Sequence, residues 1–290
     1  MPRFEIRHPE GARQTPQAKA HPGPTDRPGS RPTGRAARRE RAALAAAMRP
    51  PAPVVAAPLQ LDLEGAAPWA PVTLDTPAGP LTRVYEDAHL LVFDKPSGLH
   101  SVPGKGEDKQ DCLSRRVQSI YPEALVVHRL DLDTSGLIVM ARGLEAQRRI
   151  NRAFEQRQVD KRYVAVVNGC MAAPGADWGL IDLPLALDWP NRPLHKVDAV
   201  EGKPSQTHWH LLSVEPAENL SRVLLEPFTG RSHQLRVHLQ ALGHPILGDR
   251  LYGGELATHR APRLLLHAAQ LRLPHPVDAG WLCFASPVPF

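Results

Sequence analysis

The sequence has few cysteines, no long apolar run and no apolar leader, and each absence excludes a class of protein. Its three cysteines, Cys112, Cys170 and Cys283, lie far apart and form no CxxC pair, so neither a zinc ribbon nor a disulfide framework is indicated. No segment is apolar over the length needed to span a bilayer. The Arg-rich first residues include Glu5 and Glu10 and lack the apolar stretch of a secretory signal. We therefore expect a cytoplasmic protein without membrane association.

The positive charge is concentrated at one end of the chain. Residues 1–50 contain 11 Lys and Arg against four Asp and Glu, a balance of +7, which leaves −2 for the rest of a chain whose net charge is +5. Prolines recur here, and no large apolar residue lies between Ile6 and Leu44. Such a segment buries too little apolar surface to offset its ordering entropy. We expect residues 1–80 to be a disordered, basic, Pro-rich extension and residues 81–290 to form one folded domain.

Two interpretations of the extension are open. The segment Ala36–Met48 is rich in strong helix formers and is followed by Pro50 and Pro51, so it can form a short helix. A basic arm of this kind could contact nucleic-acid phosphates. A tail with no fixed role fits the composition at least as well.

From residue 81 onward, short apolar runs alternate with amphipathic segments. Val84–Tyr85 and Leu90–Phe93 predict two strands, and Ile150 with Phe154 marks the buried face of a helix over Leu144–Gln158. Further strands are predicted over Leu137–Ala141, Arg162–Asn168, Thr207–Val214, Arg222–Phe228, Leu264–Leu266 and Trp281–Ala285, and further helices over Cys112–Ile120, with Asp111 as N-cap, and Ser232–Leu242. The pattern predicts an α+β fold with a mainly antiparallel central sheet flanked by helices and loops.

One short loop directly before an apolar strand gathers polar side chains. Residues 128–136 read HRLDLDTSG and precede the strand predicted from Leu137. Loops held by strands are where catalytic groups tend to lie. From the residues alone, a catalytic site and a structured turn, capped by Asp133 and Thr134 and completed by Gly136, are about equally favoured. A metal site is less favoured, because the histidine and the two aspartates have no recognised ligand spacing.

Two further segments place polar side chains beside predicted elements. Thr229–Leu239 (TGRSHQLRVHL) opens a helix in which Arg236 is one residue off the apolar stripe and can lie at the edge of a cleft. An exposed helix arginine is the commoner case. Lys161–Val167 (KRYVAVV) predicts a strand with apolar residues on both faces. Taken alone, Tyr163 there is more often a core residue than a catalytic one.

Together these three segments resemble the RluA family of pseudouridine synthases. That family has a His-Arg-Leu-Asp loop, a Lys-x-Tyr strand start and a Gly-Arg-[Ser/Thr]-His-Gln-[Leu/Ile]-Arg helix entry, and all three occur here. Lys95–Leu99, Gly243–Asp249 and Leu264–Ala268 are similar to further motifs of the family, in the same order. The resemblance covers about residues 81–290. Residues 188–193 (DWPNRP) resemble the short, dual-specificity branch that lacks an S4 RNA-binding domain.

The resemblance implies an isomerase that converts uridine to pseudouridine in structured RNA, in a tRNA anticodon loop, a 23S rRNA stem-loop or both. Asp131 would be the nucleophile and Arg236 its cationic partner, while Tyr163 would stack on the uracil and relay a proton. Asp133 is the rival nucleophile. Contacts to RNA are expected from His128, Arg129, Lys95, Arg231, His233 and Leu266. We expect a monomer whose partner is RNA and which needs no cofactor and no metal.

Three alternatives stay open at this point. A non-catalytic RNA-binding module would use the basic extension and the Arg-rich helix near residue 150, but it leaves Asp131, Tyr163 and Arg236 unexplained together. A hydrolase using Asp131 would release free uracil. A synthase of the same chemistry could act on rRNA only.

Overall fold

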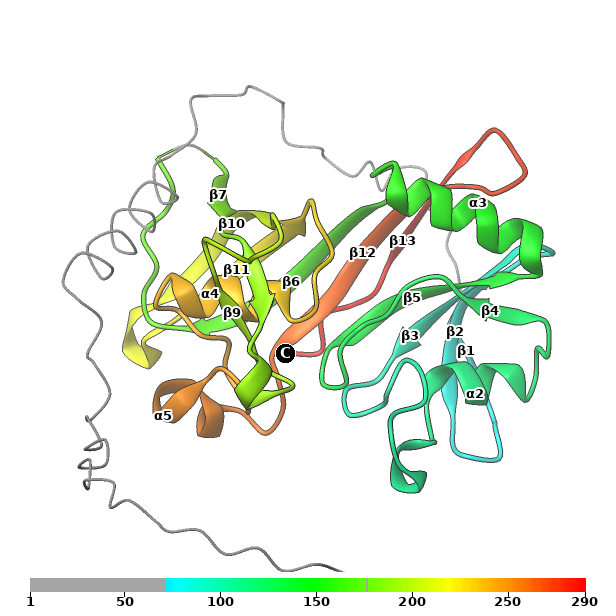
Figure 1. Cartoon of the computed structure of the whole chain (residues 1–290), viewed down its shortest axis with the longest axis horizontal. Coiled ribbons are helices and arrows are strands. Elements are labelled where there is room, and N and C mark those ends of the chain that lie inside the picture. The colour runs from blue at the N-terminus through cyan, green and yellow to red at the C-terminus, as the bar shows by residue number, and fades with distance from the viewer. Residues whose placement is uncertain (1–70, 176) are drawn as a thin grey trace, which may run out of the picture. The chain divides into compact units, whose positions relative to one another are not determined.

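A computed structural model describes residues 71–175 and 177–290, and strands dominate this part of the chain (Figure 1). Most strands join one 11-stranded sheet within the described residues. In spatial order the sheet contains β1 (Val72–Leu74), β2 (Leu81–Glu86), β3 (Leu90–Lys95), β5 (Ser135–Arg142), β12 (Leu266–Pro274), β6 (Asp160–Asn168), β11 (Leu220–Pro227), β10 (Gln206–Glu215) and β7 (Gly179–Asp182), with β4 (Ala124–Val126) beside β5 and β13 (Trp281–Ala285) beside β12.

Nearly all neighbouring strands of this sheet are antiparallel, which confirms the predicted α+β class with a mainly antiparallel sheet. The parallel pair is β5 with β12, where His267 lies opposite Ser135 and Ala268 opposite Gly136. This pair joins the strands of the N-terminal part, β1 to β5, to those of the C-terminal part. The joint therefore brings together segments that are more than a hundred residues apart in the sequence.

The apolar core forms where helices cover the two faces of β5, which is buried from Ser135 to Ala141. Alternate residues of a strand point to opposite faces. Val139 packs in a cluster with Ile150 of α3 (Leu144–Glu155), whereas Ile138 packs in another with Leu113 of α2 (Leu113–Gln118). Figure 1 shows α2 and α3 on either side of these strands.

A third cluster supports the C-terminal part of the sheet. Leu235 and Leu239 of α4 (Gln234–Ala241) pack against Val223 of β11 and Ala165 of β6. The short helix α5 (Gly254–Ala257) follows. The apolar stripe predicted for the helix after residue 232 is thus confirmed as its buried face.

Three helix boundaries differ from the prediction. Cys112, not Asp111, is the N-cap of α2, because the Asp111 carboxylate instead binds Arg116 through its Nε at 2.8 Å and its Nη2 at 2.6 Å. Helix α3 ends at Glu155, and Arg157 has a φ of 58°. Helix α4 begins at Gln234, since His233 adopts a φ of 56°, which is outside the helical region.

The sheet also begins earlier than expected. Strand β1 pairs antiparallel with β2, with Val72 opposite Arg83 and Leu74 opposite Leu81. The folded part therefore includes residues before Leu81, and the expected boundary after residue 80 is too late. The predicted helix at Ala36–Met48 lies outside the described residues.

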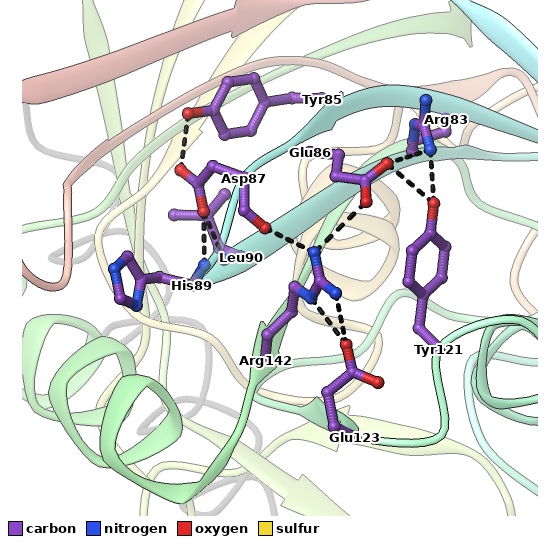
Figure 2. Close-up of polar contacts among 9 residues, drawn as sticks. All are labelled: Arg83, Tyr85, Glu86, Asp87, His89, Leu90, Tyr121, Glu123 and Arg142. Carbon is purple, nitrogen blue, oxygen red and sulfur yellow. Dashed lines mark hydrogen bonds and ion pairs between the residues drawn. The ribbon is translucent and has the colours of Figure 1, made fainter.

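A polar network joins β2, the segment before β4 and the end of β5 that is remote from Ser135 (Figure 2). Arg142 donates from Nε to Glu123 Oε1 at 2.7 Å and from Nη1 to the Asp87 carbonyl at 2.8 Å. The Tyr121 hydroxyl donates to Glu86 Oε2 at 2.9 Å, and Arg83 contacts both of these residues. The network fixes the Arg142 end of β5. The polar loop precedes the other end of β5, so it leads into an anchored strand.

A separate two-stranded sheet lies outside the large one. It consists of β8 (Leu185–Leu187) and β9 (His195–Val197), with Leu187 opposite His195. Its connecting loop contains a short 3-10 helix, Trp189–Asn191. Among the described helices, none is long and apolar enough to cross a membrane.

Candidate active site

The polar loop predicted from the sequence connects β4 to β5, and backbone hydrogen bonds fix its position. Ser101 Oγ donates to the Leu130 carbonyl at 2.7 Å and accepts from the Leu130 N–H at 3.0 Å. The Gly98 N–H donates to the Leu132 carbonyl at 3.0 Å, and Ser97 Oγ donates to the Asp133 carbonyl at 2.7 Å. The segment after β3 therefore holds the loop without using either aspartate side chain.

Lys95, expected to contact RNA, lies beneath this loop instead. It is 0% exposed, and its Nζ donates to the carbonyls of Pro96, Leu99 and Leu132 at 2.9, 2.8 and 3.0 Å. Burial lowers the pKa of Lys95 to about 7, although the charge of Asp133 opposes the shift. An ammonium already bound to three carbonyls has no donor left for a phosphate. The structure therefore corrects the prediction, and Lys95 holds the loop.

Gly136 allows the loop to reach β12. Its φ is 110°, and a Cβ built at this position would lie 2.3 Å from the Ala268 carbonyl oxygen. Only glycine combines that backbone conformation with so close an approach. The turn expected to end at Gly136 is thus also the point at which the two parts of the sheet meet.

Eight of the nine expected site residues line one cavity of about 310 Å³. They are Asp131, Tyr163, Arg236, His128, Arg129, Arg231, His233 and Leu266. These residues come from the loop before β5, from β6 and β12, and from α4 and the segment just before it. The joint between the two parts of the sheet therefore creates the cavity.

The two rival aspartates face different cavities. Asp131 lines the cavity that also contains Tyr163 and Arg236. Asp133 lines a larger one of about 890 Å³, together with Lys95 and Arg263. Geometry therefore favours Asp131 as the reacting carboxylate, in agreement with the family resemblance.

Arg236 contacts Asp131, but its principal partner is a residue that the sequence analysis did not single out. Arg236 Nη1 lies 3.5 Å from Asp131 Oδ2. Its Nε and Nη2 donate to the two carboxylate oxygens of Asp249, at 2.8 and 2.7 Å. Asp249 is 0% exposed and also accepts from the N–H groups of Leu251 and Tyr252. The expected pairing of Arg236 with Asp131 alone is thus incomplete.

Asp249 determines how the guanidinium lies. Burial lowers the pKa of Arg236, but the hydrogen bonds and charge of Asp249 more than offset this and raise it. Two of the three guanidinium nitrogens are used by Asp249, which directs the third toward Asp131. The segment Gly243–Asp249 stood out as a motif, yet nothing in its sequence indicated this partner.

Tyr163 lies on β6 and lines the cavity. It packs partly against two apolar clusters, one from each part of the sheet. Burial and then the nearby charge of Asp131 raise the pKa of Tyr163 above its usual value. The phenol therefore stays protonated at neutral pH, with an apolar ring and one donor available to a bound base.

His128 positions the loop through a hydrogen bond to the backbone of β5. Its Nε2 accepts from the Val139 N–H at 3.0 Å, and its ring centroid lies 4.9 Å from that of Phe154. Burial, and secondarily the charge of Lys161, lowers the pKa of His128 to about 3, so the ring is neutral. Arg129 and Arg231 are exposed at the cavity, and Arg231 Nε donates to the Pro204 carbonyl at 3.4 Å.

His233 stands between Asp131 and Tyr252. Its Nε2 lies 4.0 Å from Asp131 Oδ1, and its Nδ1 lies 2.6 Å from the Tyr252 hydroxyl, which also accepts from the His195 N–H at 2.9 Å. Burial lowers the pKa of His233, which keeps the ring neutral. If the Tyr252 hydroxyl donates to Nδ1, the ring proton is on Nε2 and points toward Asp131.

Metal ligation has no geometric support here. Within residues 71–175 and 177–290, no three His, Cys, Asp or Glu side chains gather as a set that could bind a metal ion. The metal interpretation of the 128–136 loop would have required such a set.

Comparison with known proteins identifies the family of the chain. The RNA pseudouridylate synthase family matches residues 89–241. The dual-specificity RNA pseudouridine synthase RluA of Escherichia coli (strain K12) is 50% identical over 210 residues, which are 72% of this chain and 94% of that protein. The corresponding protein of Haemophilus ducreyi is 45% identical over 204 residues, 70% of this chain and 91% of that one.

A solved structure gives the same result. Human RNA pseudouridylate synthase domain containing 1 superposes with a TM-score of 0.58 at 31% identity, covering 72% of this chain and 84% of that one. The chain belongs to the RNA pseudouridylate synthase family and is an isomerase that acts on RNA. The non-catalytic RNA-binding module and the hydrolase are thereby disfavoured.

Proposed function

We propose that this synthase modifies uridines in two kinds of RNA, a tRNA anticodon loop and a 23S rRNA stem-loop. The relatives that are half identical over most of the chain are named as dual-specificity enzymes. Residues 188–193 (DWPNRP), which resemble that branch, form the loop between β8 and β9, and the ring of His195 in β9 lies 5.2 Å from that of the cavity residue His233. The observation that supports the chemistry most directly is the convergence of Asp131, Tyr163 and Arg236 on one cavity.

The reaction is an isomerisation in which atoms balance without a co-reactant. The bond from N1 of uracil to C1′ breaks, the base turns, and C5 bonds to C1′. C5 then loses its proton and N1 gains one, so the product is an isomer of the substrate. A uridine stacked in a loop must first leave its stack to enter the cavity. Arg129, exposed at the cavity and two residues from Asp131, can occupy the place that the base leaves.

Asp131 is the proposed nucleophile. Its side chain is 22% exposed, so it is accessible to a bound nucleotide while Arg236 stabilises its negative charge. The Asp131 carboxylate has three alternative first reactions, namely attack on C1′, attack on the uracil ring and removal of the C2′ proton. Tyr163 would stack on the uracil and, as a protonated phenol, donate to or relay a proton from the turning base.

The test maps pseudouridines in total RNA from cells with and without the gene. Loss of one tRNA anticodon-loop site and one 23S rRNA site would support the proposal. Loss of the rRNA site alone would support the rRNA-only alternative. The purified enzyme acting on a uridine-containing stem-loop should form pseudouridine and release no free uracil, whereas a hydrolase would release it.

The remaining expectations belong to the same proposal. A monomer and a cytoplasmic location stay predictions, which size-exclusion chromatography with light scattering and cell fractionation would test. Independence from metals predicts that prior treatment with EDTA leaves the rate on a pre-folded stem-loop unchanged.

A further inference from the structure

The loop between β8 and β9 presents an exposed tryptophan covered on one face by an arginine. Trp189 is 66% exposed, and the Arg192 guanidinium carbon lies 4.7 Å from the centroid of its ring. Arg192 is itself exposed. The indole thus has one face stacked on a cation and the other open to solvent.

The loop is ordered by its own hydrogen bonds, not by burial of the tryptophan. Asn191 Nδ2 donates to Asp188 Oδ2 at 2.9 Å, and the Asn191 N–H donates to the Asp188 carbonyl at 3.0 Å. The Leu194 N–H donates to the Asn191 carbonyl at 3.0 Å. Since folding does not bury Trp189, its large apolar surface remains available to a partner.

The base of this hairpin is built into the active site. Leu185, Val237 of α4 and Tyr252 form one apolar cluster. Tyr252 contacts both His195 and His233, and His233 lies 4.0 Å from Asp131. Figure 1 shows β9 close to α4.

Trp189 follows directly on the paired part of the hairpin. The Asp188 N–H donates to the Leu194 carbonyl at 2.9 Å, next to His195. At about 3.3 Å per residue, the Trp189 backbone is then on the order of 10 Å from that of His195. The His195 ring centroid lies 5.2 Å from that of His233, whose Nε2 lies 4.0 Å from Asp131 Oδ1. Two residues therefore connect this end of the hairpin to Asp131, and Trp189 is within reach of a nucleotide near a uridine bound there.

We propose that Trp189 and Arg192 form a stacking platform for an unpaired base that flanks the target uridine. Single-stranded RNA loops are recognised by stacking on aromatic rings and on guanidinium planes, and every base has a face that can stack. Arg192 also places a positive charge where the nucleotide's phosphate passes. The inference rests on the proposed action on stem-loops and adds the residues that bind the neighbouring nucleotide.

The chain offers a matched control in Trp281. This residue is 49% exposed, and the Arg272 guanidinium carbon lies 4.2 Å from its ring centroid. It pairs with Pro274 at the far end of β12 from the cavity residue Leu266, about 26 Å along the strand at about 3.3 Å per residue. The same pair of groups therefore occurs away from the site.

The experiment compares single-turnover rates over a range of enzyme concentrations on a stem-loop RNA. Trp189→Ala should raise the half-saturating concentration about 10-fold, within the range for one base stack, and leave the maximal rate unchanged. Trp189→Tyr keeps a stacking ring and should restore binding to within about twofold. Trp281→Ala should match the wild type.

A second arm identifies the nucleotide. Abasic substitutions are made one at a time around the target uridine. With an abasic site at the stacked position, the wild type should bind the RNA about 10-fold more weakly than the intact RNA. Trp189→Ala should bind the abasic and the intact RNA equally well. The inference is overturned if Trp189→Ala binds like the wild type or if Trp189→Tyr fails to restore binding. It is also overturned if the losses of binding caused by Trp189→Ala and by the abasic site add together at every position. Turnover by the wild type and Trp281→Ala on the same RNA tests the proposed function separately.

Discussion

Asp131 and Asp133 are two residues apart, yet they should respond differently to the same substitution. Asp131→Asn keeps the shape of the side chain and removes the charge beside Arg236, so we expect turnover to fall by roughly three orders of magnitude or more while RNA binding persists. Asp133 faces the other cavity and contributes its carbonyl, not its carboxylate, to the bond with Ser97. Asp133→Asn should therefore keep substantial activity.

The measurement is single-turnover pseudouridine formation, with circular dichroism as the check on folding. Equal loss in the two variants, or loss in Asp133→Asn alone, would mean that the wrong carboxylate has been assigned.

The buried pair of Asp249 and Arg236 predicts a combined loss of stability and rate. Asp249→Asn leaves the guanidinium without its charge partner, and breaking a buried pair costs roughly 3–5 kcal/mol. The rate should also fall, because nothing then directs the third nitrogen toward Asp131. Urea unfolding and single-turnover rates would show both effects. Asp278→Asn, which removes a carboxylate whose side chain is 77% exposed, should change neither; an Asp249→Asn enzyme as stable and active as the wild type would contradict the proposed role.

At the scale of elements, the burial of Lys95 beneath the loop predicts a pH-dependent stability. The folded state lowers the pKa of Lys95 to about 7 from its usual value of 10.5. Between these values the unfolded chain binds more protons than the folded one, so the stability contributed by this residue rises with pH. From pH 7.5 to 8.5 the wild type should gain up to about 1.4 kcal/mol relative to Lys95→Met.

Urea unfolding of both proteins at several pH values measures this difference. Lys109→Met, a substitution at an exposed lysine, serves as the control and should track the wild type. Parallel stability curves for the wild type and Lys95→Met would show that Lys95 keeps its ordinary pKa.

The elements that the sequence predicted are those with a local signal. The apolar runs Leu90–Phe93 and Leu137–Ala141 correspond to β3 and β5, and the spacing of Ile150 and Phe154 marked the buried side of α3. Strands β1, β8 and β9 have three residues each and no run to mark them. Their strand conformation depends on pairing partners that only the folded chain supplies.

The site was also predictable only in part, but for a different reason. Asp131, Tyr163 and Arg236 were found through motifs, not through any local physical signal, since a tyrosine in an apolar strand is ordinarily a core residue. Asp249 was missed because its role arises from a contact with Arg236 across the fold. Lys95 was misassigned because a lysine beside a turn is usually exposed, whereas here three carbonyls surround its ammonium.

At the scale of the whole molecule, the excess positive charge lies outside the described domain. Residues 1–50 hold +7, and residues 51–70 hold −2 from Asp62 and Glu64, which accounts for the entire net charge of +5. Residues 71–290 are therefore neutral in sum. A neutral domain gives little long-range attraction for RNA, so any such attraction would come from the N-terminal residues.

This distribution leads to a prediction about the extension. Deleting residues 1–70 keeps β1, which a deletion through residue 80 would remove. If the extension contacts RNA phosphates, the deletion should raise the half-saturating enzyme concentration and flatten its dependence on salt, by about 0.7–0.9 in log–log slope for each lost contact. The maximal rate should stay the same, because no proposed catalytic residue lies there. Replacing the 11 Lys and Arg of residues 1–50 by Gln in the full-length chain separates charge from length and should reproduce the deletion. A salt dependence identical in all three proteins would show that the extension takes no part in binding.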